Sequence, residues 1–230
     1  LRDSGFVNEI SSLKPDIIVV VAFRILPKEV FRIPRMGSFN LHAALLPKYR
    51  GAAPINWAII NGETETGVSS FLLEEKVDTG SVVLQARVRI GPDETAGDLH
   101  DKLAEVGAEI VLQTVRLMEL GRANPRQQDH ELTSPAPKII KEQCRIDWKS
   151  SAQQVHNFVH GMSPTPCART KHRETLLKIY RTSLINSVSG ASEKKEAGYV
   201  VHVGGEDFIV QTGDGIVKLL EVQQEGKKRL

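Results

Sequence analysis

The chain has few cysteines, and it lacks any long hydrophobic run. Its two cysteines, Cys144 and Cys167, form no CxxC pair and have no histidine at zinc-finger spacing. A small secreted domain held by disulfides carries more cysteines, so both are expected to be reduced thiols in a cytoplasmic protein. No stretch reaches about 18 apolar residues, so no transmembrane helix and no membrane partner are expected.

Motifs for metals and for nucleotide phosphates are also missing. His156 and His160 have the i, i+4 spacing of a helical metal pair, but no Glu follows His156 and no third ligand lies at a suitable spacing. The two histidines are therefore predicted to be structural, and no metal is expected. The glycines match neither G-x-G-x-x-G nor the Walker pattern, which excludes these phosphate-binding loops.

The composition is that of a soluble globular protein, with 40% hydrophobic and 25% charged residues. Its 230 residues are many for one compact domain and sufficient for two. Charge is distributed unevenly: residues 1–137 hold 15 Lys and Arg against 18 Asp and Glu, whereas residues 138–230 hold 15 against 10. The net charge is thus −3 in the first part and +5 in the second, which suggests a polyanionic partner for the second.

Hydrophobic patterning predicts an α/β domain over residues 1–120. The β-branched run Asp16–Ala22 predicts a strand buried on both faces, as in a parallel sheet. Further strands are expected at 38–41, 67–73 and 81–90. Helices are expected at 53–61, where Pro54 suits the first turn, and at 95–120, where leucines, valine and isoleucine follow one stripe. The alternation of strands and helices favours the α/β class.

The remainder of the chain predicts a linker and a small β-barrel. Residues 121–137 are polar and rich in Pro and Gln, as in an extended linker. A helix is expected at 151–160, because Ser151 and Gln154 form a capping box. Short strands are expected at 176–182, 198–203, 208–212 and 216–222. Such strands indicate a barrel domain at 138–230.

Asn40, His42 and Asp78 form a candidate catalytic set. Residues two apart on a strand project from one face, so Asn40 and His42 converge near the end of the strand at 38–41. Open α/β sheets bind ligands beyond the carboxyl ends of their strands, and Asp78 lies in a turn between two expected strands. An amide donor, an imidazole and a carboxylate suit attack by an amine on a carbonyl-like carbon. Spacing alone leaves a purely structural interpretation open.

Longer motifs around this set carry a family resemblance. They are Ser38–Pro54, which contains Leu-Leu-Pro-x-Tyr-Arg-Gly-Ala-Ala-Pro, Gly62–Val68, Val77–Gly80, Ala136–Ile139, Arg145–Trp148, His156-Asn157 and the tail through Lys227-Lys228-Arg229. Nearly throughout, the chain resembles the methionyl-tRNA formyltransferases, within the folate-dependent formyltransferase family. The resemblance implies a Rossmann-like formyltransferase domain followed by a small OB-like β-barrel domain. It also implies that the sequence lacks the N-terminal part of the first domain.

The resemblance implies a reaction and a role for each residue. A formyl group would pass from 10-formyltetrahydrofolate to the α-amine of methionyl initiator tRNA, with no metal. Asn40 would hold the formyl oxygen, His42 would stabilise the oxyanion, and Asp78 would orient His42 and accept a proton through water. The protein would act as a monomer. Family members usually have glycine at the positions of Cys167 and Arg24.

The resemblance also implies two groups of binding residues. The folate would lie against Phe23, Ile25, Leu26, Pro27, Leu45, Leu46, Pro47, Leu73 and Val77. The tRNA would contact Arg50, Lys138, Lys141, Lys171, Arg173, Lys227, Lys228 and Arg229.

Three other functions stay open at this point. A formyltransferase acting on a nucleotide-linked amino sugar has a similar layout. The single-domain glycinamide ribonucleotide enzyme would not need residues 138–230. A non-catalytic RNA-binding module would leave the Asn40, His42 and Asp78 set as part of the sheet core.

Overall fold

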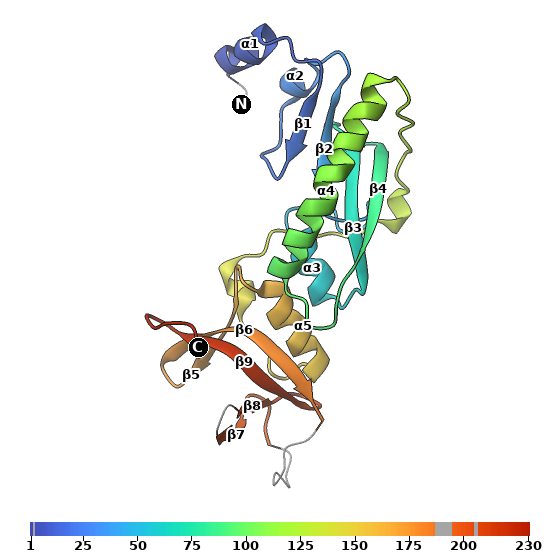
Figure 1. The fold of residues 1–230 in the computed structure, drawn as a ribbon. Helices are drawn as coiled ribbons and strands as arrows, with labels where there is room; N and C mark the ends of the chain where they lie inside the picture. Colours follow the sequence, from blue (N-terminus) through green and yellow to red (C-terminus); the bar gives the residue numbers. More distant parts are fainter. Residues whose placement is uncertain (2, 187–194, 205–206) are drawn as a thin grey trace. The chain divides into compact units, whose positions relative to one another are not determined.

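The computed structural model describes residues 1, 3–186, 195–204 and 207–230 of the chain (Figure 1). These residues form two compact units. The first contains Leu1–Pro54, Glu65–Arg89 and Asp101–Pro137, and the second contains Ile55–Thr64, Ile90–His100 and Lys138–Leu230. The units differ from the expected ranges in two ways: residues 121–137 belong to the first unit, and residues 55–64 and 90–100 belong to the second. The domain boundaries themselves stay a prediction.

The first unit is built on a four-stranded mixed sheet. Its strands are β1 (Ile18–Val21), β2 (Ser38–His42), β3 (Glu65–Leu72) and β4 (Val82–Arg89). They lie in the order β1-β2-β3-β4, with β1 parallel to β2 and the other neighbours antiparallel. The strands predicted from the sequence are therefore confirmed, and β2 lies between β1 and β3.

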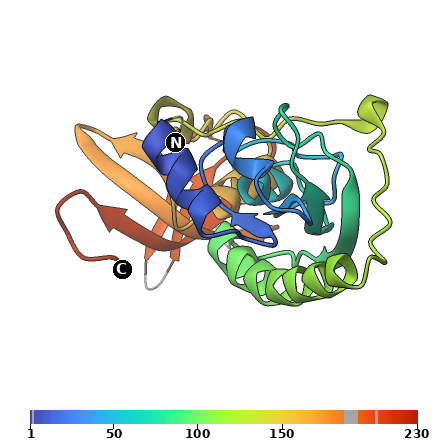
Figure 2. The same cartoon turned by 90° about the horizontal axis from the view of Figure 1, so that it is seen from above.

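Helix α4 (Ala96–Glu119) confirms the longest predicted helix, and its later turns cover one face of this sheet. Figure 2 shows α4, in green, along one side of the sheet. Contact is close at Gly107, where an added Cβ would come within 2.7 Å of the Leu41 side chain. Thr114 Oγ1 also forms a hydrogen bond of 2.7 Å with Ser70 Oγ. Because Leu41 faces α4, its neighbours Asn40 and His42 project from the opposite face of the sheet.

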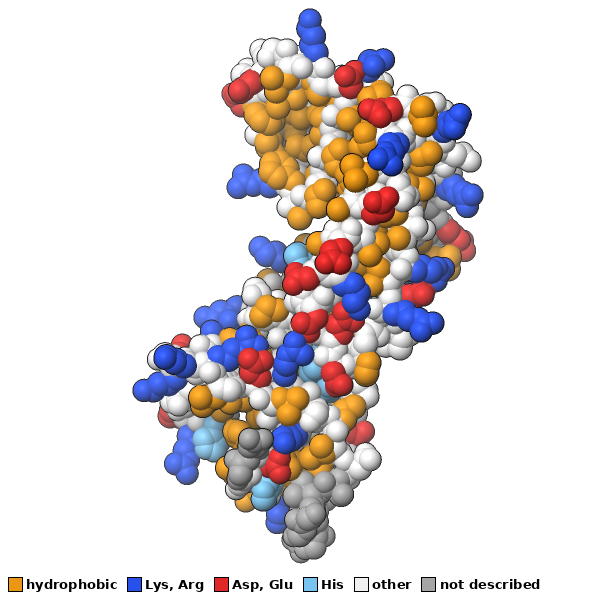
Figure 3. All heavy atoms as spheres, viewed as in Figure 1, with side chains coloured by type: hydrophobic (Ala, Val, Ile, Leu, Met, Phe, Trp, Pro, Cys, Tyr) orange, Lys and Arg blue, Asp and Glu red, His pale blue; other side chains and the backbone are white. Residues whose placement is uncertain are grey.

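Strand β1 departs from the prediction of a strand buried on both faces. Val19 and Val21 are 37% and 52% exposed, and Phe23 and Ile25 in the following loop are 62% and 72% exposed. Figure 3 shows hydrophobic side chains gathered on the face of the first unit seen there. The physical reason is that β1 is the edge strand of the described sheet, where fewer elements cover its side chains. Two short helices, α1 (Ser4–Ser12) and α2 (Lys28–Phe31), were not predicted from the sequence.

The second unit packs a helix against a five-stranded antiparallel sheet. The strands are β5 (Ala168–His172), β6 (Thr175–Ile185), β7 (Val200–Gly204), β8 (Asp207–Gln211) and β9 (Ile216–Gln224), in the order β5-β6-β9-β8-β7. Helix α5 (Ala152–Met162) has the predicted capping box between Ser151 and Gln154. Val155, Val159 and Met162 of α5 pack against Ile179 and Val217 in the core. Strand β5 was not predicted.

Three short helices complete the described elements. Helix α3 (Pro54–Ile60) confirms the predicted helix, and Gly62 after it has a φ of +74°. The segments His130–Leu132 (η1) and Lys141–Cys144 (η2) are single 3-10 turns. None of the described helices is long and apolar enough to span a membrane. The α/β class of the first part and the small all-β sheet of the second confirm the predicted fold class.

Candidate active site

The site begins with two polar side chains on strand β2. Asn40 pairs across the sheet with Val20 of β1 and Phe71 of β3, so it lies in the middle of the sheet. His42 is the last residue of the strand and is only 6% exposed. Because the two residues are separated by one position, both project from the face opposite α4. The amide and the imidazole therefore lie on one face at the carboxyl end of β2.

Asp78 lies beside His42, although 36 residues separate them in the chain. Asp78 Oδ2 lies 3.9 Å from His42 Nδ1, and the Asp78 side chain is 9% exposed. The same oxygen accepts a hydrogen bond of 2.9 Å from the Gly51 backbone N–H. Asp78 has a φ of +56°, an uncommon conformation for a residue other than glycine. Such backbone conformations gather at functional sites, where surrounding contacts maintain them.

The other ring nitrogen of His42 has a defined role. His42 Nε2 lies 2.7 Å from the Tyr49 carbonyl oxygen, which can only accept a hydrogen bond. Nε2 therefore carries a proton and donates it to Tyr49. In the neutral ring Nδ1 is then the acceptor, and it faces the Asp78 carboxylate. The imidazole is thus held between the Tyr49 carbonyl and the Asp78 carboxylate.

The loop after β2 is held in place by residues 134–136. Ser134 Oγ accepts from Tyr49 N at 2.9 Å, and the Ser134 carbonyl accepts from Arg50 N at 2.9 Å. The Ala136 carbonyl accepts from Ala53 N at 3.1 Å. Gly51 has a φ of +127°, and a Cβ there would lie 2.5 Å from the Ala136 carbonyl oxygen. Only glycine fits this close approach, which explains the glycine in the Arg50-Gly51-Ala52 motif.

Gln128 is a buried residue that connects two segments of the site, and it was not predicted from the sequence. Its amide Nε2 donates to the carbonyl oxygens of Asp78 and Gly80, at 2.9 and 2.8 Å. Its Oε1 accepts from Arg50 Nε and Nη2, at 3.1 and 2.6 Å. One side chain thus connects the Asp78 turn to the loop after β2. The sequence offers little sign of this role, because Gln128 lies in a polar stretch that resembles a linker.

Two family models match the chain. A model described as formyl transferase matches residues 1–115, and one described as formyl transferase, C-terminal domain, matches residues 138–230. The chain belongs to the formyl transferase family. A methionyl-tRNA formyltransferase from Clostridioides difficile is 44% identical over 230 residues, which cover all of this chain and 73% of that protein. The predicted family membership is confirmed.

Solved structures share the fold of this formyl transferase at low identity. HypX from Aquifex aeolicus, in complex with tetrahydrofolic acid, matches with a TM-score of 0.75 at 23% identity. The match covers 98% of this chain and 39% of that protein. WlaRD, a sugar 3N-formyl transferase, matches with a TM-score of 0.69 at 21% identity over 95% of this chain and 77% of that one. At these identities the comparison establishes the fold alone.

The expected folate contacts of this formyl transferase fall into three groups. Phe23, Ile25, Leu26 and Pro27 follow β1, and Leu45, Leu46 and Pro47 follow β2. Because β1 and β2 are parallel and Val21 pairs with Leu41, these two loops leave the sheet at the same edge. Val77, which is 51% exposed, adjoins Asp78.

Leu73 is the exception among the expected folate contacts. Its backbone N–H donates to the Ser38 carbonyl, at the opposite end of β2 from His42. There it lines a separate cavity of about 660 Å³ with Phe31, Arg32 and Glu75. Leu73 thus lies at the other end of β2 from the loops that contain most of the expected contacts. The folate contacts themselves stay a prediction.

The expected tRNA contacts lie in both units. Arg50 belongs to the first unit, where Gln128 and the His130 ring engage its guanidinium. The other expected contacts belong to the second unit, where all of them are exposed: Lys138, Lys141, Lys171, Arg173, Lys227, Lys228 and Arg229. Arg229 differs from the rest, because it pairs with Glu221 and stacks 3.8 Å above the Tyr180 ring. In this structure Arg229 is committed to internal contacts.

His156 and His160 are structural in this fold. Both are buried on α5, and the described residues contain no cluster of three His, Cys, Asp or Glu that could hold a metal. His156 Nε2 lies 3.0 Å from the Pro92 carbonyl, and His160 Nδ1 lies 3.1 Å from the Asp93 carbonyl. These bonds connect α5 to the segment before α4.

Proposed function

We propose that this protein transfers the formyl group of 10-formyltetrahydrofolate to the α-amine of methionyl initiator tRNA, for translation initiation. The observation that carries the proposal is that Asp78 lies 3.9 Å from His42, which shares one face of β2 with Asn40. The relative from C. difficile, similar along the whole chain, supports the choice of acceptor. Both cysteines are free and buried, which agrees with action in the reducing cytoplasm. A monomeric state stays a prediction.

In the proposed reaction, the amine nitrogen forms a bond to the formyl carbon, and the bond from that carbon to N10 of the folate then breaks. The Asn40 amide donates a hydrogen bond to the formyl oxygen as negative charge develops there. The amine loses a proton, which passes through water to the Asp78 carboxylate, and N10 gains one as it leaves. His42, held between Tyr49 and Asp78, stabilises the oxyanion from the same face of β2 as Asn40.

The two substrates are assigned to different surfaces. The folate occupies the loops after β1 and β2 together with Val77, where exposed apolar side chains such as Phe23 and Ile25 can contact a planar ring system. The lysines and arginines of the second unit contact the phosphates of the tRNA, since residues 138–230 carry a net charge of +5. Lys138 and Lys141 lead into this unit, and Lys171 and Arg173 lie on and after β5.

Substitution of Asn40 and His42 tests this mechanism. In Asn40→Ala and His42→Ala, kcat should fall by roughly 100-fold or more, because each change removes a group that acts on the developing charge. The measurement is transfer of labelled formyl from 10-formyltetrahydrofolate to methionyl-tRNA by purified protein. Leu112→Ala on the exposed face of α4 is the matched control and should leave kcat unchanged. Unchanged rates in both site variants would disprove the mechanism and favour a non-catalytic RNA-binding protein.

A second class of formyl acceptor is compatible with the same site. The structural match to WlaRD, a sugar 3N-formyl transferase, shows that this fold also occurs in a protein named for a sugar acceptor. A nucleotide-linked amino sugar is therefore the competing substrate. Because an amine is the nucleophile in both cases, Asn40, His42 and Asp78 do not discriminate between them. Discrimination rests on the charged second unit.

A further inference from the structure

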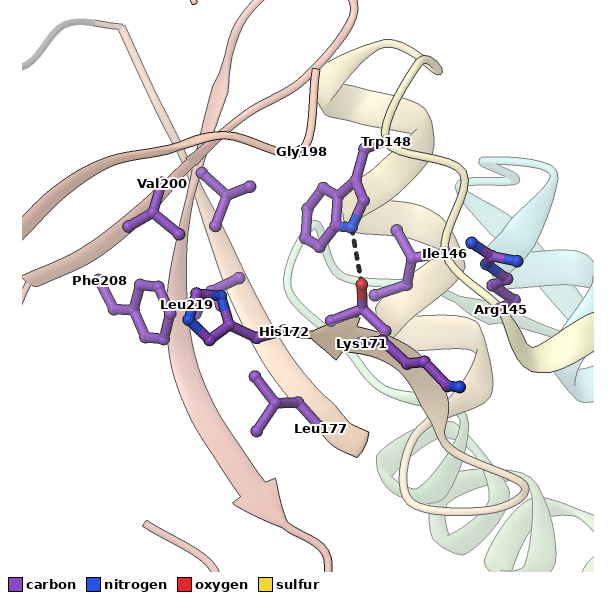
Figure 4. Close-up of a pocket in the computed structure, with 12 residues that line it drawn as sticks. Arg145, Ile146, Trp148, Lys171, His172, Leu177, Gly198, Val200, Phe208 and Leu219 are labelled. Atoms are coloured by element: carbon purple, nitrogen blue, oxygen red, sulfur yellow. Dashed lines mark hydrogen bonds between the residues drawn. The ribbon is translucent and has the colours of Figure 1, made fainter. Parts of the chain in front are cut away.

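The second unit contains a small pocket that the proposed reaction does not use. Its volume is about 170 Å³. Figure 4 shows the rings of Trp148, Phe208 and His172 around it, together with the aliphatic side chain of Leu177. The remaining walls come from the ends of β5 and β7 and from β8 and β9. The pocket is therefore lined by the sheet of the second unit together with residues 145–148.

The size and lining of the pocket suit a single planar ring system. A cavity of about 150 Å³ accommodates benzene, whereas pockets for larger ligands run to about 300–1,000 Å³. Aromatic and aliphatic walls favour a flat apolar face. Trp148 is held in a fixed orientation, because its Nε1 donates to Thr170 Oγ1 at 2.9 Å. A whole folate is too large for this space, but one nucleobase fits.

The residues around the pocket add positive charge. Arg145 and Lys171 both line it, and both are exposed to solvent. They come from neighbouring segments, because Ile146 N donates to the Arg169 carbonyl at 2.8 Å and so joins residues 145–148 to β5. None of the described residues that line the pocket is acidic. Aromatic rings beside lysine and arginine are typical of sites for unpaired nucleic-acid bases.

We propose that this pocket receives one unpaired base of an RNA, with a neighbouring phosphate on Lys171 or Arg145. The proposal rests on the proposed function, in that tRNA is the RNA that the enzyme meets. The base would stack on Trp148 or His172, and Leu177 would close the inner wall. Stacking on an aromatic side chain recognises any base, so the pocket would add affinity for single-stranded RNA with little sequence preference.

Trp148 fluorescence tests whether the pocket binds a base. In a Trp57→Phe background Trp148 is the only tryptophan, because the chain has two. A single-stranded hexamer of adenylate should quench its emission in a saturable manner, more weakly at higher salt. An abasic hexamer with the same phosphates should not quench it. Equal quenching by the abasic chain, or no quenching by either, overturns the proposal. Binding of free AMP as tight as that of the hexamer also contradicts it, since the site would then serve a mononucleotide.

A pocket-filling variant tests the same claim without fluorescence. Leu177→Phe places a larger side chain in the pocket and should weaken binding of the hexamer and of tRNA by roughly tenfold. Leu220→Phe is the matched control, because Leu220 is 50% exposed on β9 and does not line the pocket. Equal unfolding midpoints of the two variants show that Leu177→Phe is folded. Unchanged RNA affinity in a folded Leu177→Phe protein overturns the proposal.

The two proposals can fail separately. If the protein binds the hexamer through Trp148 but does not formylate methionyl-tRNA, the pocket stands and the proposed function is wrong. If it formylates methionyl-tRNA while Leu177→Phe leaves the affinity for tRNA unchanged, the proposed function stands and the pocket assignment is wrong.

Discussion

At the scale of single residues, Gln128 connects two segments of the candidate active site. Its side chain binds the carbonyls of Asp78 and Gly80 and also the Arg50 guanidinium, and it is only 6% exposed. A buried carbonyl that loses its donor costs about 1–3 kcal/mol. Gln128 therefore stabilises the uncommon backbone conformation of Asp78 and acts as a positioning residue, since it reaches the reaction only through its neighbours.

Replacement of Gln128 should slow the reaction without weakening substrate binding. In Gln128→Ala the Asp78 turn loses its donor, and kcat should fall by roughly 10–100-fold at a nearly unchanged KM, because small displacements of reacting groups are costly. The measurement is steady-state formyl transfer with both substrates varied. Gln127→Ala, the exposed neighbour, is the control and should behave as the unmodified protein. A folded Gln128→Ala protein with a normal kcat would show that Asp78 is positioned without Gln128.

At the residue scale, the sequence was informative where the backbone geometry requires a particular residue of a motif. The glycine of Arg50-Gly51-Ala52 is required by its φ of +127° and by the nearby Ala136 carbonyl. At Cys167, where the family resemblance implies glycine, φ is +73°, a backbone conformation that favours glycine. Gln128 could not be found in this way, because its role depends on partners 48 to 78 residues distant.

At the scale of elements, helix α5 depends on two histidines that lie within the core. The rings of His156 and His160 have centroids 4.1 Å apart. His160 Nε2 accepts a hydrogen bond of 3.2 Å from Thr182 N, and Nδ1 lies 3.1 Å from the Asp93 carbonyl. Burial, followed by the nearby His156, lowers the pKa of His160 below its ordinary value. The folded protein therefore favours the neutral ring at this position.

This environment predicts acid sensitivity of the second unit. Because the folded pKa of His160 is lowered, the unfolded chain binds more protons as the pH falls below about 6.5. The stability that the neutral His160 ring contributes is fully present above that pH. It is lost as the pH falls toward the lowered pKa of His160 in the folded protein. The free energy of unfolding should then drop by up to about 1.4 kcal/mol per pH unit for each extra proton. Urea unfolding between pH 7 and 5 measures this slope.

Two variants separate His160 from the other titrating groups. His160→Asn should flatten the pH dependence of unfolding, even though loss of the buried ring lowers stability at every pH. His202→Gln, which changes an exposed histidine on β7, should keep the original slope. An unchanged slope in His160→Asn would contradict the assignment.

Elements with regular patterns were predictable, and those defined by long-range packing were not. The stripe of α4 and the capping box of α5 depend on local spacing, and both are confirmed. Strand β5, with the sequence Ala-Arg-Thr-Lys-His, has no apolar alternation and forms because β6 pairs with it. Strand β1 has the composition of a central strand but lies at the edge of the described sheet. The hydrophobic pattern of a strand does not show which strands lie beside it.

For the whole molecule, the sequence resemblance supports the roles of the site residues, and the structure supports their arrangement. The resemblance supplied the roles of Asn40, His42 and Asp78, since an Asn-x-His spacing alone is common. The structure adds that His42 and Asp78 lie 3.9 Å apart and that one face of β2 presents Asn40 and His42. The positive charge of residues 138–230 favours an RNA acceptor over a small sugar. This charge belongs to the second unit as a whole and not to any single residue.

The most direct test compares the two acceptors with the same purified protein. The measurement is kcat/KM for formyl transfer from 10-formyltetrahydrofolate to methionyl initiator tRNA and to a nucleotide-linked amino sugar. The account predicts a value for the tRNA at least roughly 100-fold higher, because only a large polyanion can use the basic residues of the second unit. An equal or higher value for the amino sugar would contradict it.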